Sequence, residues 1–157
     1  MTRPRVYIET TIVSYLTAYA SRDLLRAAHQ QVTREWWVSR TGFELYTSEV
    51  VLRESRAGDP SAAADRLRAL DGIPLLAVTD EALALAGHLV RQGGLPAKAA
   101  ADALHVAVAA AHGMEYLLTW NCTHIANVTM RPLIESICRA ANFDPPLLCT
   151  PLEFDEE

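Results

Sequence analysis

An almost entirely apolar helix constrains the fold of this 157-residue chain more than any other feature. Residues 99–111 read Ala-Ala-Ala-Asp-Ala-Leu-His-Val-Ala-Val-Ala-Ala-Ala. A helix that is apolar on nearly every face is normally buried within a domain. The segment therefore predicts a layered structure in which other elements cover this helix on several sides.

Asp102 stands inside that apolar segment, and no Lys or Arg lies within one turn of it. A buried carboxylate is costly unless a charge or a metal ion meets it. The sequence therefore favours a cation bound at Asp102. The alternative is that Asp102 lies in the first turn of the helix, where the helix dipole favours an acid.

Short strand-like segments alternate with helical segments along the chain. Strands are expected at residues 6–8, 43–47, 73–78, 115–119 and 147–150, and helices at 12–16, 23–39, 48–54, 62–70, 79–91, 99–111 and 132–141. Thr11, Ser48 and Thr79 stand where helix caps are expected. The alternation is typical of a parallel sheet with helices on both faces. We expect an α/β fold, a three-layer α/β/α sandwich with a central, mainly parallel sheet, formed by residues 1–157 as a single domain.

Composition limits the classes of protein to which this chain can belong. Half of the residues are apolar and 21% are charged, which argues against disorder. No signal segment and no long apolar stretch is evident, so we expect a cytoplasmic protein with no membrane contact. A net charge of −5 is not typical of proteins held to nucleic acid by bulk electrostatics, but it leaves an RNA substrate open. The three cysteines lack metal-finger spacing and are expected to be reduced.

Four polar residues are expected to meet at one edge of the sheet, because ligands of open parallel sheets bind beyond the carboxyl ends of the strands. Glu9 ends the first strand, Glu54 lies in the helix after the second, Asp102 opens the helix before the fourth, and Asn121 follows that strand. Carboxylates without basic partners repel one another, and Mg²⁺ or Mn²⁺ relieves that repulsion. We expect Glu9 and Asp102 to be the metal ligands. Glu54 and Asn121 would complete the site directly or through water.

Each of these residues also has a simpler interpretation. Glu9 could be a surface acid at a strand end, and Glu54 an exposed partner of a neighbouring arginine. Asn121 could be a turn former that bonds its own backbone. His105, one turn after Asp102, could be a proton shuttle, although a structural role is favoured.

Four segments also resemble the motifs of PIN-domain proteins. Val-Tyr-Ile-Glu-Thr-Thr-Ile-Val-Ser-Tyr-Leu at 6–16 is similar to their opening motif, and residues 48–54, with an acid six residues after a serine, are similar to the second. Asp-Ala-Leu-His at 102–105 and Leu-Leu-Thr-Trp-Asn at 117–121 resemble the third and fourth. The match looks most like VapC-type toxins of bacterial type II toxin–antitoxin systems. That resemblance implies a metal-dependent ribonuclease, a homodimer and a cognate antitoxin protein.

The chain departs from the family pattern at two positions. The first acid is usually Asp in the family and is Glu9 here, and the fourth motif often carries Asp where this chain has Asn121. The longer Glu9 side chain displaces its carboxylate, and Mg²⁺ tolerates distorted coordination poorly. An amide oxygen also contributes no charge, so we expect one firmly bound metal rather than two.

The residues and the resemblance together predict a metal-dependent endoribonuclease that hydrolyses RNA phosphodiester bonds. The alternative is a catalytically weakened module that binds RNA or a protein partner. A small-molecule phosphohydrolase is disfavoured, because the chain lacks an Asp-x-Asp nucleophile motif. Trp36 and Trp37 point about 100° apart on one helix, so one of them is expected to be exposed and to form the homodimer interface. The alternative is that both pack within one subunit.

Overall fold

A five-stranded parallel sheet forms the centre of the computed structural model, which describes residues 2–154. The strands are β1 (Arg5–Ile8), β2 (Glu44–Ser48), β3 (Leu75–Leu76), β4 (Tyr116–Leu118) and β5 (Leu147–Cys149). Their order is β3-β2-β1-β4-β5, and every neighbouring pair is parallel. The strand expected at 73–78 is shorter than predicted, because Pro74 before it has no N–H to donate to the sheet.

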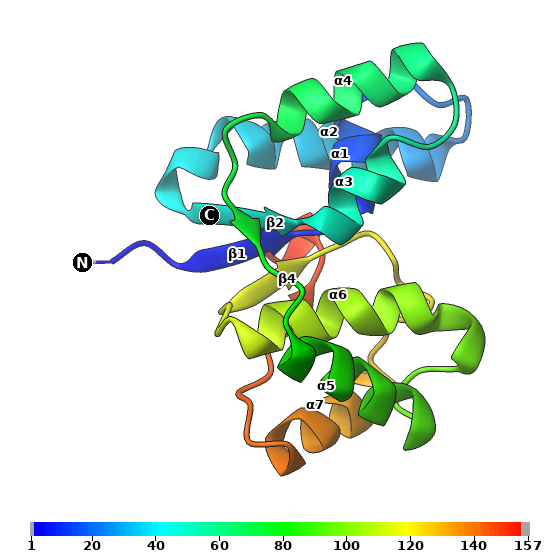
Figure 1. The fold of residues 1–157 in the computed structure, drawn as a ribbon. Helices are drawn as coiled ribbons and strands as arrows, with labels where there is room; N and C mark the ends of the chain where they lie inside the picture. Colours follow the sequence, from blue (N-terminus) through cyan, green and yellow to red (C-terminus); the bar gives the residue numbers. More distant parts are fainter. Residues whose placement is uncertain (1, 155–157) are drawn as a thin grey trace.

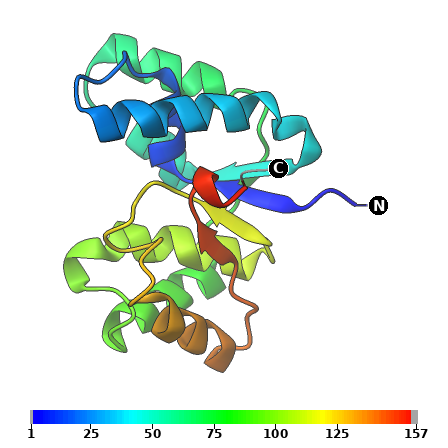
Figure 2. The same cartoon turned by 180° about the vertical axis from the view of Figure 1, so that it is seen from behind.

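Helices cover both faces of this sheet (Figure 1). One layer contains α1 (Thr10–Thr17), α2 (Leu24–Val38), α3 (Glu49–Ser55) and α4 (Pro60–Leu70). The other contains α5 (Asp80–Arg91), α6 (Ala100–Ala111) and α7 (Arg131–Ala140). Short 3-10 helices occur at η1 (Arg40–Gly42), η2 (Ala97–Ala99) and η3 (Pro151–Phe154). Seen from behind, β5 and η3 lie between the two helical layers, which confirms the predicted three-layer sandwich (Figure 2).

The apolar helix α6 is buried as predicted, but Asp102 is not. All the residues of α6 from His105 to Ala110 are buried, and α6 packs against α5. The helix begins at Ala100, so Asp102 lies in its first turn, and 21% of the Asp102 side chain is exposed. The expectation of a buried acid was therefore wrong, and the helix-dipole alternative describes its position.

Two of the three expected helix caps differ from prediction. Glu9, rather than Thr11, is the N-cap of α1, and its side chain accepts a hydrogen bond from the Thr11 amide. Ser48 occupies the N-cap position of α3, but its hydroxyl bonds no amide of that helix. Thr79 caps α5 as predicted, through the Ala82 amide.

Both tryptophans of α2 pack within the chain. Trp36 is 5% exposed and its ring centroid lies 5.6 Å from that of Phe43. Trp37 is half-buried, with the Arg40 guanidinium 4.6 Å from its ring centroid. The homodimer was predicted from an exposed tryptophan, and neither Trp36 nor Trp37 is exposed. That premise was therefore wrong, and the homodimer stays a prediction. Among the described residues, no helix is long and apolar enough to cross a membrane.

Candidate active site

The winding of the sheet reverses at β1, where β2 lies on one side and β4 on the other. In open parallel sheets, the crevice at such a point is where ligands bind. Ile8 pairs with Leu118, and the Glu9 amide donates to the Leu118 carbonyl at 3.1 Å. The register therefore brings Glu9 beside Thr119, at the carboxyl ends of the two strands.

Glu9 is a buried carboxylate held by hydroxyl and amide donors. The residue is 4% exposed. Its Oε1 accepts from the Thr119 hydroxyl at 2.6 Å, the Thr11 hydroxyl at 2.5 Å and the Thr11 amide at 3.2 Å. Within residues 2–154, no hydrogen bond reaches the second oxygen, Oε2. The side chain is therefore fixed in direction and keeps one oxygen for a further partner.

Glu54 extends from α3 toward Glu9 and contacts two other elements. Its Oε1 accepts from the Thr10 hydroxyl in α1 and from His105 Nε2 in α6, the latter at 2.8 Å. One side-chain oxygen or nitrogen each from Glu9, Glu54 and His105 lie within 4.8 Å of one another. The structure thus brings two predicted site residues together and adds His105 to them.

Asp102 and Asn121 meet a different histidine. Asp102 Oδ2 lies 3.0 Å from His124 Nδ1, and Asn121 Oδ1 accepts from the His124 amide at 3.0 Å. Asn121 is therefore a turn former that bonds the nearby backbone, as its simpler interpretation predicts. This turn places His124 beside Asp102. The sequence favours a cation from outside the chain at Asp102, whereas in the structure His124 of the chain itself is a partner of this carboxylate.

Comparison with protein families identifies the fold. A family model of the PIN domain matches residues 6–121, from β1 through the turn after β4. The chain belongs to the PIN-domain family. The PIN domain is generally a nuclease fold, and the matched residues include all four predicted site residues. A search of curated proteins gave no match.

Glu54 and His105 are electrostatically coupled in this PIN domain. Burial alone would lower the pKa of His105, but its hydrogen bond to Glu54 and the negative charges of Glu9, Glu54 and Asp102 raise that pKa overall. Burial alone would raise the pKa of Glu54, but the hydrogen bond and charge of His105 and the bond from Thr10 lower it overall. Both shifts favour a carboxylate facing an imidazolium.

The other side of His105 faces two buried hydroxyl groups. Tyr7 lies in β1 with its hydroxyl 2.7 Å from His105 Nδ1 and 2.7 Å from Ser48 Oγ. All three side chains are completely buried. Burial raises the pKa of Tyr7 far above its ordinary value, so the phenol stays neutral. Both ring nitrogens of His105 therefore have a protein partner.

The donor set of the PIN domain suits a divalent cation. Carboxylate oxygens are the ligands that Mg²⁺ and Mn²⁺ prefer, and an imidazole is compatible with a transition metal. Glu9 and Glu54 each keep an oxygen, Oε2, that accepts no hydrogen bond from residues 2–154. Asp102 lies outside the compact group of Glu9, Glu54 and His105 and stays a predicted ligand.

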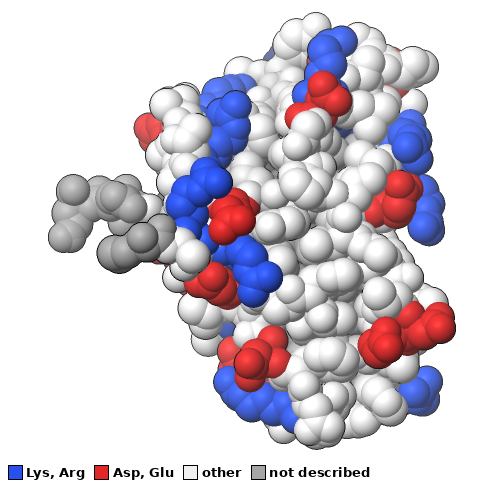
Figure 3. Space-filling view, turned by 60° about the vertical axis from the view of Figure 1, so that its left-hand side comes forward, with Lys and Arg blue, Asp and Glu red and all other residues white. Residues whose placement is uncertain are grey.

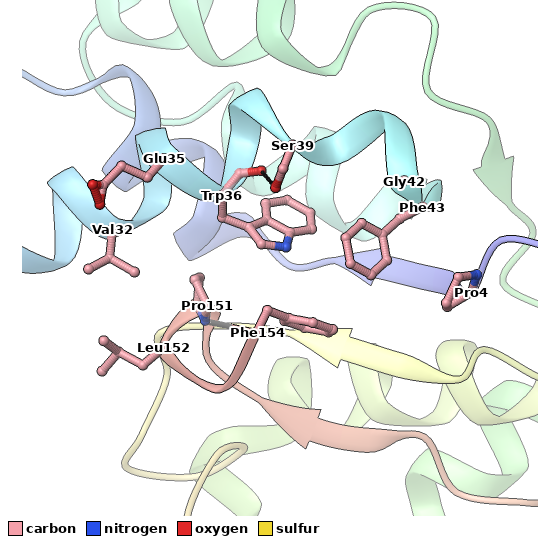
Figure 4. Close-up of a pocket in the computed structure, with 10 residues that line it drawn as sticks. All are labelled: Pro4, Val32, Glu35, Trp36, Ser39, Gly42, Phe43, Pro151, Leu152 and Phe154. Carbon is pink, nitrogen blue, oxygen red and sulfur yellow. Dashed lines mark hydrogen bonds between the residues drawn. The ribbon is translucent and has the colours of Figure 1, made fainter. Parts of the chain in front are cut away.

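A separate cavity of about 900 Å³ lies between α2 and η3 (Figure 4). Aromatic rings of Trp36, Phe43 and Phe154 form much of its wall, and Trp36 Nε1 has no hydrogen-bond partner among the described residues. Glu35 lies at its edge (Figure 4). None of the predicted site residues lines this cavity, so the acidic cluster is distinct from it.

Sequence reasoning missed four polar side chains that surround the site: Tyr7, Ser48, Thr119 and His124. Tyr7 carried a usable signal, because a tyrosine within a buried strand needs a partner for its hydroxyl. Ser48 ends β2 and Thr119 follows β4 at the same edge of the sheet as Glu9, which is a weaker signal. Nothing in the spacing of His124 links it to Asp102.

Proposed function

We propose that this PIN domain is a metal-dependent endoribonuclease that hydrolyses RNA phosphodiester bonds. The observation that carries the proposal is the meeting of Glu9 and Glu54 at the point where the sheet reverses its winding. Two carboxylates at this crevice, in a generally nucleolytic family, favour a cation site, because His105 faces only Glu54 and no Lys or Arg among the described residues is paired with either acid.

The side chains of the site have distinct roles in this proposal. A divalent cation bound there would lower the pKa of a water molecule and offset the charge that develops on the phosphate. Glu9 and Asp102 would hold the cation, and Glu54 and Asn121 would complete the site directly or through water. Hydrogen bonds from Thr11 and Thr119 keep the Glu9 carboxylate in one orientation, so binding requires little rearrangement there.

The charge distribution favours a narrow range of RNA targets. The face shown in Figure 3 has basic and acidic side chains interspersed, and the chain has 19 acidic residues against 14 basic ones. Non-specific affinity for nucleic acid comes mostly from basic residues that neutralise phosphates. Recognition would therefore depend on individual arginines and on the shape of the RNA.

The cellular role we propose is that of a VapC-type toxin acting in the cytoplasm as a homodimer, with a cognate antitoxin protein as its inhibitor. The support for this role is the resemblance of the four motifs. Induced expression should arrest growth, and co-expression of the product of a small neighbouring gene should relieve the arrest. Normal growth at high expression of the intact protein would contradict the toxin role and leave the nuclease proposal standing.

Purified protein incubated with total cellular RNA tests the activity. With Mn²⁺ we expect a few discrete cuts, mapped by end sequencing, and none with EDTA. Glu9→Gln and Glu54→Gln remove the charges and keep the shapes, so both should lose cleavage. A matched control is Glu81→Gln, at an acid in the first turn of α5 that is distant in the sequence from all four site residues. This variant also loses one negative charge, and it should cleave RNA normally. Cleavage that survives EDTA, or that survives in Glu9→Gln, would refute the proposal.

A second candidate function is a catalytically weakened module that binds RNA or a protein partner. One observation favours it. Asp102 and Asn121 both bond to His124 and lie outside the compact group of Glu9, Glu54 and His105. The module hypothesis predicts RNA binding that is unchanged by EDTA and by Asp102→Ala. Cleavage by the wild type that is lost in Asp102→Ala would exclude it.

A further inference from the structure

His105 contacts a site carboxylate through one ring nitrogen and a buried phenol through the other. Nε2 lies 2.8 Å from Glu54 Oε1, and Nδ1 lies 2.7 Å from the Tyr7 hydroxyl. The imidazole is 0% exposed. A buried ring with both nitrogens bonded cannot turn without leaving a polar atom unpaired, which is costly. The orientation of His105 is therefore fixed from two sides.

The Glu54 carboxylate, by contrast, is only weakly restrained by its own position in the fold. It lies in α3, a helix of seven residues, and 34% of its side chain is exposed. A glutamate side chain has several rotatable bonds, and an exposed one samples many rotamers. The hydrogen bonds from Thr10 and His105 restrict it, and of these two donors only His105 is itself completely buried.

Ser48 supports the same arrangement at the far end of the hydrogen-bonded chain. It stands at the N-cap of α3, where a serine hydroxyl normally bonds a helix amide. Here the hydroxyl bonds Tyr7 at 2.7 Å and caps no amide. The chain Ser48–Tyr7–His105–Glu54 therefore joins β2, β1 and α6 to the carboxylate in α3.

We infer that His105 is a positioning residue that holds the Glu54 carboxylate beside Glu9, where the two together receive a divalent cation, and that Tyr7 and Ser48 anchor its ring. The inference rests on the metal-dependent function proposed above. It differs from a proton-shuttle role because His105 acts through Glu54 and needs no contact with RNA. It also differs from a packing role, because the required feature is one N–H donor at the position of Nε2.

Two substitutions of His105 separate the donor from the ring. The amide nitrogen of glutamine can reach the position of Nε2, whereas that of asparagine reaches only the position of Nδ1. We expect His105→Asn to weaken Mn²⁺ binding about 10- to 100-fold, the usual effect of losing a group that orients a ligand. His105→Gln should bind Mn²⁺ nearly as the wild type does. Calorimetric titration of Mn²⁺ into each protein, without RNA, measures both.

Val106→Ala is the matched control, since Val106 is completely buried in the same helix and makes no polar contact with the site. This variant should melt at a lower temperature and bind Mn²⁺ normally. In metal-free wild-type protein, the Nε2–H proton of His105 should give a downfield NMR signal protected from solvent exchange, and that signal should shift in Glu54→Gln.

The results distinguish this inference from the proposed function. Folded His105→Asn with wild-type affinity, or His105→Gln as weak as His105→Asn, would overturn the positioning role. Absence of the protected Nε2–H signal would also overturn it. A wild type that binds Mn²⁺ but cuts no RNA refutes the ribonuclease, while the ranking of the His105 variants still decides the role of His105. A wild type that binds no Mn²⁺ would overturn both.

Discussion

Replacing Tyr7 by phenylalanine removes a single oxygen from the hydrogen-bonded chain that joins Ser48, through Tyr7 and His105, to Glu54. The Tyr7 hydroxyl bonds both Ser48 Oγ and His105 Nδ1, so both atoms lose a partner. Ser48 stands at the N-cap of α3, and its hydroxyl can turn to the amides of that helix. His105 Nδ1 has no comparable second partner among the contacts of the described residues, so it is left unpaired in the core.

The loss of stability in Tyr7→Phe comes from the unpaired Nδ1 of His105. A buried polar atom without a partner lowers the free energy of unfolding by about 1–3 kcal/mol. For a chain of this length each kcal/mol lowers the melting temperature by about 2–4 °C, so Tyr7→Phe should melt roughly 2–12 °C below the wild type. Calorimetry in EDTA measures this difference without any contribution from bound metal.

Tyr46→Phe is the control for loss of a tyrosine hydroxyl. Tyr46 lies in the neighbouring strand β2, is half-buried, and forms no side-chain hydrogen bond with residues 2–154. Its replacement should change the free energy of unfolding by less than about 0.5 kcal/mol. If Tyr7→Phe melts with the wild type, or if both variants fall equally, the hydrogen-bonded chain contributes no stability and the reasoning is wrong.

Three further predictions concern the acids of the site. Millimolar Mn²⁺ should raise the melting temperature of the wild type by binding only the folded state, and the rise should be smaller in Asp102→Ala; equal rises would remove Asp102 from the ligands. Asn121→Asp keeps an oxygen that accepts from the His124 amide and adds a charge, so it should fold normally and bind Mn²⁺ more tightly in calorimetry; unchanged affinity would leave position 121 with a turn role alone. The lowered pKa of Glu54 gives stability that is present above its ordinary value of 4.5 and lost as pH falls through the folded pKa. The raised pKa of His105 gives stability that is complete below 6.5 and lost as pH rises through the folded pKa. The melting temperature in EDTA, plotted against pH, should therefore fall more steeply below pH 4.5 and above pH 6.5 in the wild type than in Glu54→Gln. Parallel plots would contradict the coupling.

The sequence predicts the architecture because its main signals are local. Alternating strand-like and helical segments specify the parallel sheet, and an apolar α6 requires cover on several sides. The edge at which ligands bind then follows from chain direction, since every strand of a parallel sheet ends at the same edge. Glu9 and Glu54 could be brought together by this reasoning without knowledge of any side-chain contact.

The hydrogen-bonded partners of those acids could not be predicted, because they depend on long-range register. His105 meets Tyr7 across 98 positions and Glu54 across 51. Whether these atoms bond depends on how far α6 is rotated about its axis, and the apolar pattern of α6 is too uniform to fix that rotation. Asp102 shows the same limit in another form. Its exposure depends on the residue at which α6 begins, and helix boundaries are the least certain part of a sequence prediction.

The bond between Asp102 and His124 raises a question of geometry that one substitution can answer. His124 Nδ1 bonds Asp102 Oδ2, and the other oxygen, Oδ1, takes no hydrogen bond from residues 2–154. A cation bound through Oδ1 alone is compatible with the bond, and His124 would then orient its ligand. A cation bound at the Oδ2 lone pair that His124 faces would have to displace His124.

We expect the first arrangement, because Asn121 fixes the turn that presents His124 to Asp102. On that arrangement His124→Ala removes an orienting group and should weaken Mn²⁺ binding about 10- to 100-fold. The substitution keeps the backbone amide that Asn121 accepts from, so the turn itself should persist. His29→Ala, at a histidine of α2 whose ring stacks on Trp120, is a control for loss of an imidazole without loss of a carboxylate partner. If His124→Ala instead binds Mn²⁺ more tightly than the wild type, His124 competes with the cation, and Asp102 is a ligand only when that bond is broken.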